Sequence, residues 1–236
     1  AAKRAGTAGC APVWPERFDM SLKELVLDFF FPPRCAFCGA ILEKSGDGVC
    51  ETCRKTLPCT ADVKRSCDFV RAYTAPFYYE EPVRQGVLTY KFGNTPARGK
   101  VFGRMLGEDL LSRGIDDFDL ISWVPLSAKR YRRRGYDQAK ILAEAAAEVL
   151  GTKAVPLLRK SRDVSPQSRL HSPEERRANI SGCYVVRSAD AVRGKDILLI
   201  DDIITTGSTL SECARMLLTA GARSIRGAAL ACHREE

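Results

Sequence analysis

The sequence has no apolar run of the length that a membrane-spanning helix needs. The longest apolar stretch near its start, Leu25 to Phe31, is interrupted by Asp28 and falls far short of the roughly 20 residues required. Residues 1–17 also lack the apolar central region of a signal peptide. We therefore expect a protein without a membrane span or an export signal, located in the cytoplasm.

Internal repeats and long low-complexity runs are absent as well. The 236 residues are 45% hydrophobic, which excludes disorder of the whole chain and is enough for one full domain core plus a small appendage. The first clear helix-forming stretch follows Met20. We expect residues 1–21 to be a leader outside the fold, 22–67 to hold a helix and a cysteine module, and 68–236 to form the main domain.

Positive charge is in excess. The chain has 37 Lys and Arg against 29 Asp and Glu, for a formal net charge of +8, and its pI is about 9.0. This balance favours an anionic partner, either a phosphate-rich small molecule or a nucleic acid. Charge alone does not choose between the two.

Strand-like and helix-like segments alternate through the main domain. Residues 102–110, 139–150 and 210–218 have apolar residues at helical spacing, and short apolar runs typical of strands cover 119–125, 154–158, 183–186, 196–203 and 224–231. This order predicts an α/β fold with a parallel sheet covered by helices. Residues 159–181 show no periodicity, and a loop of that length is usually functional or mobile.

The cysteines are unevenly distributed, since six of the 10 lie between residues 35 and 67. Cys35, Cys38, Cys50 and Cys53 form a C-x₂-C-x₁₁-C-x₂-C pattern, in which each pair can bind one side of a tetrahedral Zn²⁺. Four thiolates leave no open position for catalysis, so we interpret the zinc as structural. A redox dithiol pair and an iron–sulfur cluster are the alternatives.

The most specific motif is ILLIDDIITTGSTL at residues 197–210, where an apolar strand leads into two carboxylates and a hydroxyl-rich turn. In open α/β sheets, ligands bind beyond the carboxyl ends of strands. Thr209 and Glu212 have capping-box spacing, so the turn is expected to open onto a helix N-terminus, which favours a phosphate. Its hydroxyl and backbone groups belong to Thr205, Thr206, Gly207, Ser208 and Thr209.

The two carboxylates of this motif, Asp201 and Asp202, suit sugar hydroxyls or a hydrated Mg²⁺ beside a bound phosphate. The alternative is that Asp201 caps the turn while Asp202 is merely solvated. A Walker B strand would need a P-loop as partner. The nearest candidate, GNTPARGKV at residues 93–101, has one residue too many between its glycines and Val where Ser or Thr should follow the Lys, which excludes a P-loop ATPase.

DDIITTGST resembles the phosphoribosyl-diphosphate (PRPP) motif of type I phosphoribosyltransferases. LVLDFFFPPRCAFCG, VPLSAKRYRRRGYDQA and RRANISGCY together resemble the ComF proteins associated with competence and DNA uptake, which have an amidophosphoribosyltransferase-like fold of this type. The resemblance spans about residues 22–233. It implies a type I phosphoribosyltransferase-like parallel sheet flanked by helices, with a small N-terminal zinc-ribbon-like module.

By this resemblance, Asp201 and Asp202 are the catalytic pair that contacts ribose, and residues 205–209 hold the 5′-phosphate. The loop after the first core strand binds pyrophosphate in the family, so Ser127, Lys129 and Arg130 are expected to face PRPP. The aperiodic stretch that includes Arg159, Lys160 and Arg162 is expected to be the mobile loop that closes over the ligand. A charged linker would look the same.

The chain departs from the family pattern in two places. Asp137 stands where the family's RGFNQ-like stretch leads us to expect Asn, which puts the contact of that residue in doubt. Many relatives carry a second pair of CxxC knuckles, whereas Cys59 and Cys67 are isolated here. We therefore expect the second zinc module to be lost and these two residues to be ordinary thiols.

Two functions stay open. The first is an enzyme that transfers a phosphoribosyl group from PRPP, with Mg²⁺, to an acceptor that the sequence does not name. The second is a non-catalytic PRPP sensor that binds single-stranded DNA. For the DNA we expect contacts from the zinc module and from a basic loop containing Arg132, Arg133 and Arg134, with Tyr131 and Tyr136 stacking on bases. A solvated basic run is the alternative for these arginines.

Overall fold

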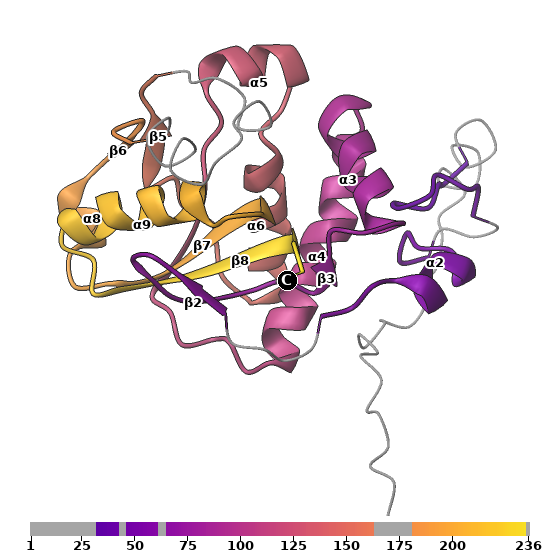
Figure 1. Cartoon of the computed structure of the whole chain (residues 1–236), viewed down its shortest axis with the longest axis horizontal. Helices are drawn as coiled ribbons and strands as arrows, with labels where there is room; N and C mark the ends of the chain where they lie inside the picture. Colours follow the sequence, from indigo (N-terminus) through magenta and orange to yellow (C-terminus); the bar gives the residue numbers. More distant parts are fainter. Residues whose placement is uncertain (1–31, 43–45, 61–64, 163–180, 235–236) are drawn as a thin grey trace, which may run out of the picture.

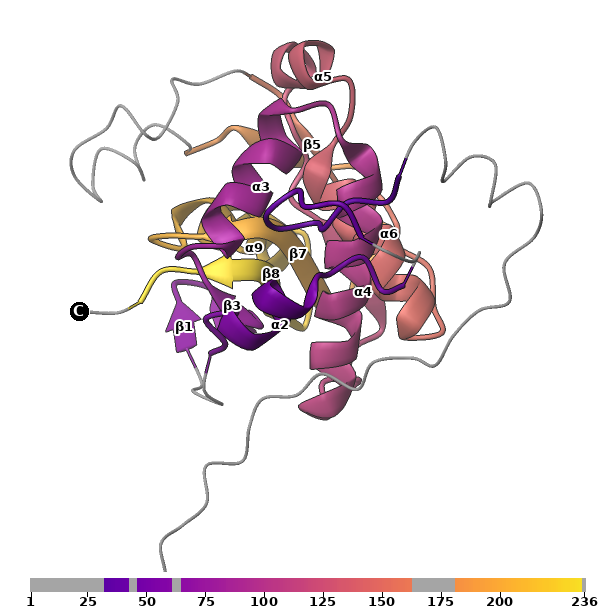
Figure 2. The same cartoon turned by 90° about the vertical axis from the view of Figure 1, so that its right-hand side faces the viewer.

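The computed structural model describes residues 32–42, 46–60, 65–162 and 181–234. The leader, the helix expected after Met20 and residues 163–180 of the long loop lie outside the described residues. Helices and strands alternate over most of the chain (Figures 1 and 2). In the described part, no helix is long and apolar enough to cross a membrane.

The centre of the molecule is a six-stranded sheet with the order β1-β2-β8-β7-β4, in which β3 also pairs with β8. β1 and β2 are antiparallel, and the other pairings are parallel. The strands are β1 (Arg65–Cys67), β2 (Val70–Thr74), β3 (Phe77–Tyr78), β4 (Leu120–Trp123), β7 (Asp196–Ile204) and β8 (Ser224–Cys232). The predicted α/β fold with a parallel sheet is confirmed.

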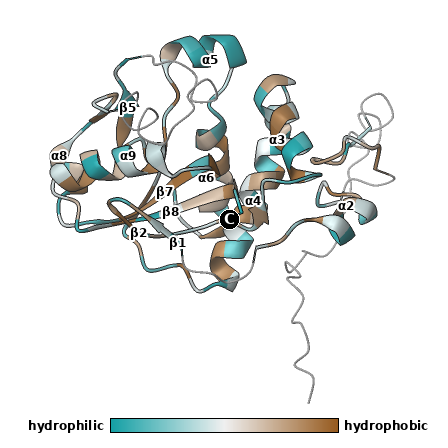
Figure 3. Ribbon diagram, in the orientation of Figure 1, coloured by the Kyte–Doolittle hydropathy of each residue, from teal (hydrophilic) through white to brown (hydrophobic). Residues whose placement is uncertain are grey.

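Both faces of this sheet are buried. Successive side chains of a strand point to opposite faces, and in β7 Leu198 and Ile200 face one hydrophobic cluster whereas Ile197 and Leu199 face another. A strand buried on both sides reads as a continuous apolar run, which explains why the sequence predicted β7 so closely. In Figure 3 these inner strands have mainly hydrophobic colouring, whereas α5 has mainly hydrophilic colouring.

Helices cover the two faces unequally. The cluster on one face includes residues of α3 (Val83–Phe92), α4 (Pro96–Ser112) and α6 (Gln138–Val149), and the other face packs against α9 (Ser208–Thr219). Shorter helices are α2 (Glu51–Thr56), α5 (Ala128–Arg134) and α8 (Ala189–Val192), and β5 (Leu158–Lys160) and β6 (Tyr184–Val186) form a separate antiparallel pair. The sequence patterns did not predict α3, and they placed α5 in a loop.

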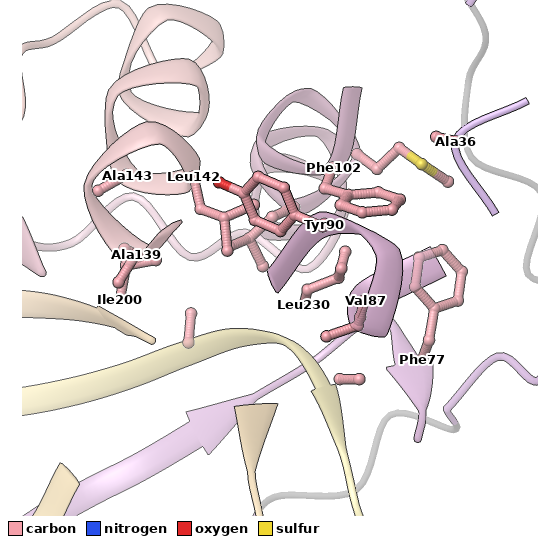
Figure 4. Packing of buried hydrophobic residues seen from close by; sticks show 14 of the residues in the cluster. Ala36, Phe77, Val87, Tyr90, Phe102, Ala139, Leu142, Ala143, Ile200 and Leu230 are labelled. Atoms are coloured by element: carbon pink, nitrogen blue, oxygen red, sulfur yellow. The ribbon is translucent and has the colours of Figure 1, made fainter. Parts of the chain in front are cut away.

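The cysteine segment packs directly against the main hydrophobic cluster. Phe37 is fully buried, and its ring centroid lies 5.2 Å from that of Phe102 and 5.8 Å from that of Phe77. A Cβ atom on Gly86 of α3 would lie 2.9 Å from the Phe37 Cα, so a glycine is needed for this close approach. Figure 4 shows Ala36, Phe77 and Phe102 in the same cluster as the sheet residues Ile200 and Leu230.

Candidate functional site

The two carboxylates of the motif lie near the C-terminal end of β7, inside the strand. The Asp202 backbone N–H donates to the Asp201 carboxylate over 2.8 Å. Burial and the nearby negative charge of Asp202 raise the pKa of Asp201 to about 8. A raised pKa of this kind is typical of one member of two carboxylates that share a site.

The hydroxyl-rich turn joins β7 to α9, as the sequence predicted. Gly207 precedes the helix with φ of 70°, and a Cβ at this position would lie 2.8 Å from the Cβ of Cys67. The conformation and the crowding both require glycine here. The Thr206 and Ser208 hydroxyl oxygens are 2.7 Å apart. Backbone N–H groups of the first turn of α9 are therefore presented beside several hydroxyl groups.

The predicted capping box between Thr209 and Glu212 is wrong. Gly207 is the N-cap residue and makes no side-chain cap, because the helix begins earlier than the box requires. Glu212 instead accepts hydrogen bonds from the Gly182 backbone N–H at 2.7 Å and from the Arg215 guanidinium at 2.8 and 2.9 Å. Its carboxylate thus ties α9 to the segment before β6 and leaves the N-terminus of α9 open.

The two carboxylates and the turn border a cavity of about 190 Å³, which we call the strand-end pocket. Side chains from six further elements or connecting segments complete its wall. The lining residues are Lys91, Val124, Pro125, Leu126, Arg130, Arg134, Asp137, Gln138, Ala139, Lys160, Tyr184, Asp201, Asp202, Ile203, Thr205 and Thr209. Four of these are cations, so the pocket combines acidic, basic and hydroxyl groups.

Residues 128–134 form the helix α5, so the prediction of a loop is wrong here. Ser127 is its N-cap residue and accepts a hydrogen bond from the Arg130 backbone N–H. Ser127 is 3% exposed and does not line the pocket. Arg130 and Arg134 do line it, whereas Lys129, Arg132 and Arg133 project elsewhere from the same helix.

Asp137, which departs from the family pattern, caps α6. Its carboxylate accepts hydrogen bonds from the backbone N–H groups of Leu126 at 3.1 Å and Lys140 at 3.3 Å. Burial raises the pKa of this carboxyl group. Tyr136 is only 9% exposed, and its hydroxyl donates to the Tyr90 carbonyl oxygen. The prediction that Tyr136 stacks on bases is therefore wrong.

Arg159 and Lys160 belong to the strand β5, and not to the aperiodic loop in which the sequence placed them. The Lys160 Nζ lies 3.1 Å from the Tyr184 hydroxyl, and both side chains line the strand-end pocket. Burial, together with the positive charge of Arg130, lowers the pKa of Lys160. Arg162 donates to the Ser181 carbonyl and to the Cys183 Sγ, which holds it away from the pocket.

Lys91 is a pocket residue that the sequence analysis missed. It lies on α3 and pairs with the Asp202 carboxylate at 2.9 Å, with only 17% and 16% of the two side chains exposed. The signal that could have located α3 is the spacing of Val83, Val87 and Tyr90, all of which are buried. Nothing in the sequence indicates which cation reaches the acidic pair.

The cysteine centre gathers Cys35, Cys38, Cys50 and Cys53, whose Sγ atoms all lie within 4.8 Å of one another. The backbone N–H groups of Cys50 and Cys53 point at the sulfur atoms of Cys35 and Cys50, at 3.4 Å each. Four thiolates with such donors fit a closed tetrahedral zinc site. Within the described ranges, no second such cluster forms around Cys59 or Cys67.

Comparison with known proteins gives two family matches. Residues 133–236 match the phosphoribosyl transferase domain, and residues 26–70 match the double zinc ribbon domain. With the four-cysteine cluster, the second match supports a structural zinc. Lys91 lies between the two matched segments.

Several curated proteins are similar over most of their length. Competence protein ComFC of Streptococcus pneumoniae is 31% identical over 81% of this chain and 84% of that protein. DNA utilization protein YhgH of Salmonella typhimurium is 26% identical over 83% and 95%. A solved structure, the allosteric regulatory enzyme of purine biosynthesis, covers 59% of this chain and 29% of its own at a TM-score of 0.41 and 22% identity, which is too distant to carry an argument.

The four cysteines come before the pocket residues in the sequence, just as the zinc ribbon match comes before the phosphoribosyl transferase match. The similarity to ComFC extends across both matched segments. The chain therefore belongs to the ComF family of competence and DNA-utilization proteins, with a phosphoribosyltransferase domain behind a zinc ribbon.

Proposed function

We propose that the strand-end pocket binds PRPP. One observation carries the proposal, namely that the two carboxylates and the hydroxyl-rich turn of the motif border a single cavity together with four cations. A 5′-phosphate fits the turn and the first N–H groups of α9. The ribose hydroxyl groups then lie within reach of Asp201 and Asp202, and the pyrophosphate has cations to neutralise it.

The cations suit the departure of pyrophosphate. In phosphoribosyl transfer, the bond from the ribose C1 to pyrophosphate breaks, its electron pair leaves with the pyrophosphate, and a nucleophile bonds to C1 and loses its proton. Arg130, Arg134 and Lys160, which line the pocket, would stabilise the leaving charge. Mg²⁺, if held by Asp201 or Asp202 and the pyrophosphate oxygens, would neutralise part of the same charge.

Calorimetric titration of PRPP with Mg²⁺ present tests the pocket. Thr205→Ala and Asp202→Asn should each weaken binding about tenfold or more, because each removes a hydrogen-bonding group that lines the pocket. Ser112→Ala, on the far end of α4, is the matched control. Unchanged affinity in both pocket variants would place the ligand elsewhere. Release of pyrophosphate in the presence of candidate acceptors then separates an enzyme from a sensor.

A second candidate function, binding of single-stranded DNA, is favoured by the charge of α5. This seven-residue helix has the sequence AKRYRRR, with five cations and no carboxylate. In the described part of the chain, none of these cations forms an ion pair with a carboxylate closer than 4 Å. The relatives are named for competence and DNA utilization, which agrees with a DNA partner.

Salt dependence tests this second function. Arg132 and Arg133 are exposed on α5 and lie outside the pocket. If each contacts a phosphate, the Arg132→Ala, Arg133→Ala variant should reduce the slope of log K against log salt by about 1.4, at roughly 0.7 per contact. Its affinity for PRPP should stay close to that of the parent. An unchanged slope would assign the two arginines to a solvated surface.

A further inference from the structure

The end of α3 exposes an aromatic ring beside the strand-end pocket. Phe92 is the last residue of α3 and is 64% exposed, more than Ile41 at 60% or any other large apolar side chain of the described residues. It directly follows Lys91, which lines the pocket. A single exposed apolar side chain is ordinary on a protein surface. The neighbours of Phe92 are what point to a ligand that could cover this ring.

One neighbour of the ring is Arg134, at the end of α5. The Arg134 guanidinium carbon lies 5.2 Å from the centroid of the Phe92 ring, within cation–π range. Its Nη1 donates to the Gln138 Oε1 at 2.7 Å, and its Nε is buried without a hydrogen-bond partner among the described residues. Arg134 also lines the pocket. The guanidinium thus joins the Phe92 ring to the pocket wall.

A second exposed ring lies on the same side of α5. Tyr131 is 51% exposed and comes one helical turn before Arg134, so the two side chains project from neighbouring positions on the helix surface. Arg130, next to Tyr131, lines the pocket as well. Both views of the fold show α3 and α5 at the same end of the molecule (Figures 1 and 2). We call Phe92, Arg134 and Tyr131 the aromatic rim.

The positive charge around the aromatic rim indicates which class of ligand it fits. Lys129, Arg132 and Arg133 are exposed on the same short helix. Single-stranded nucleic acids are bound by this combination, in which rings stack on bases and cations follow the phosphates. An acidic peptide would satisfy the cations but does not present a row of planar bases to the two rings. The rim therefore fits a single strand better than it fits a protein.

We propose that Phe92 and Tyr131 are base-stacking residues for a single-stranded nucleic acid, which lies across the mouth of the strand-end pocket. The inference rests on the second candidate function and identifies the surface that performs it. It replaces the buried Tyr136 with Phe92 as the second ring. It also places a nucleotide next to the site that we assign to PRPP, so the two ligands would lie side by side.

Fluorescence anisotropy with a labelled 20-nucleotide oligo(dT) tests the rim. Phe92→Ala and Tyr131→Ala should each weaken binding about 5- to 150-fold, the usual effect of losing one stacked base. The slope of log K against log salt should not change, because neither substitution removes a charge. Phe92→Trp should retain the affinity, since a larger ring still stacks. Leu111→Ala, which shortens a side chain 49% exposed at the end of α4, is the matched control.

An abasic strand of the same length separates stacking from other contacts. It keeps the phosphates and lacks the bases on which Phe92 and Tyr131 would stack, so the parent protein and Phe92→Ala should bind it equally. The proposal is overturned if both alanine variants bind oligo(dT) like the parent, or if they lose as much affinity for the abasic strand. Failure of the parent to bind oligo(dT) would remove the rim together with the DNA function. PRPP titration of the same sample decides the pocket independently.

Discussion

At the scale of single residues, the notable contact is the pairing of Lys91 with Asp202. Two adjacent carboxylates repel each other, which contributes to the raised pKa of Asp201, and the Lys91 ammonium offsets the charge of Asp202. The positive charge of Lys91 also lowers the pKa of Asp201, against the larger effects of burial and Asp202. Lys91 is therefore a positioning residue for the acidic pair.

Replacing Lys91 with Met should weaken PRPP binding about tenfold at pH 7, the equivalent of one unit in the pKa of the acidic pair. Binding by the parent should strengthen as pH rises toward about 8, where Asp201 ionises. In Lys91→Met this rise should move to higher pH. Lys55→Met, on the exposed face of α2, is the control. Weaker binding with an unshifted pH profile would contradict the positioning role.

Asp201 should reduce the stability of the ligand-free protein. Its folded pKa is raised to about 8 from an ordinary value of 3.8, so between these limits the folded state binds a proton that the unfolded state lacks. Stability is then lost as pH rises through this window. Asp201→Asn, which needs no proton, should be the more stable protein. Its advantage should be larger at pH 8 than at pH 6, by on the order of 1 to 2 kcal/mol.

Urea unfolding at both pH values, with zinc present, measures this difference. Asp196→Asn is an instructive contrast. Its carboxylate accepts hydrogen bonds from Arg223 and Ser224, which lowers the pKa of Asp196 to about 2. Loss of that carboxylate should reduce stability, not increase it. An Asp201→Asn protein that gains nothing between pH 6 and pH 8 would show that Asp201 is ionised throughout.

At the scale of secondary-structure elements, α3 connects the two halves of the protein. Its Gly86 packs on the backbone of Phe37 in the cysteine segment, and its Lys91 reaches the strand-end pocket. The Tyr90 hydroxyl between them donates to the Gln138 carbonyl oxygen at 2.9 Å. One short helix thus contacts both the cysteine segment and the acidic pair.

Gly86→Ala tests whether the contact of α3 with the Phe37 backbone outweighs the gain in helix propensity. Alanine favours a helix interior by about 1 kcal/mol over glycine, yet a Cβ here would lie 2.9 Å from the Phe37 Cα and 3.0 Å from the Ala36 carbonyl oxygen. We expect a net loss of about 1 to 3 kcal/mol in the free energy of unfolding, measured with urea. Gln85→Ala, exposed one residue earlier, should be neutral. A Gly86→Ala protein more stable than the parent would mean that the cysteine segment moves to accommodate the added methyl group.

Elements with continuous apolar runs were predictable, whereas those that depend on tertiary contacts were not. The strands β4, β7 and β8 were predicted within one or two residues, because burial on both faces leaves an unambiguous pattern. Helix α5 has no apolar stripe, although Ser127 as N-cap and Gly135 with φ of 80° are signals that could have located it. Helix α3 contains Gly86 and β-branched residues, whose low helix propensity is overcome by packing.

The site was predictable to a similar degree. The motif in β7 indicated the acidic pair and the turn without any structure, since consecutive residues must lie together. Lys91 and Phe92 come from other segments, and only the fold brings them to the pocket or its mouth. Lys160 was expected near the ligand by resemblance, although in a loop and not in β5. Tyr136 was predicted incorrectly, because its ring was expected at the surface but is buried in the hydrophobic cluster that supports α3.

At the scale of the whole molecule, the zinc centre and the sheet share one hydrophobic cluster. We expect the Cys50→Ser, Cys53→Ser variant to lose its zinc and to unfold in one transition at a lower temperature than the parent, since a structural zinc contributes directly to folding. Metal analysis and calorimetry measure both. Cys59→Ser should keep one zinc per chain. Loss of zinc with an unchanged unfolding temperature would contradict the shared core.

The position of β8 has a consequence for synthesis of the chain. This strand is the last of the described strands, yet it lies between β2 and β7 and pairs with both. A ribosome must therefore deliver all the other described strands before the two sides of the sheet can join, and such non-local parallel pairing is slow. The zinc ligands, by contrast, are all present once Cys53 has emerged. The metal centre can thus become the earliest fixed point of the nascent protein, against which the later segments assemble.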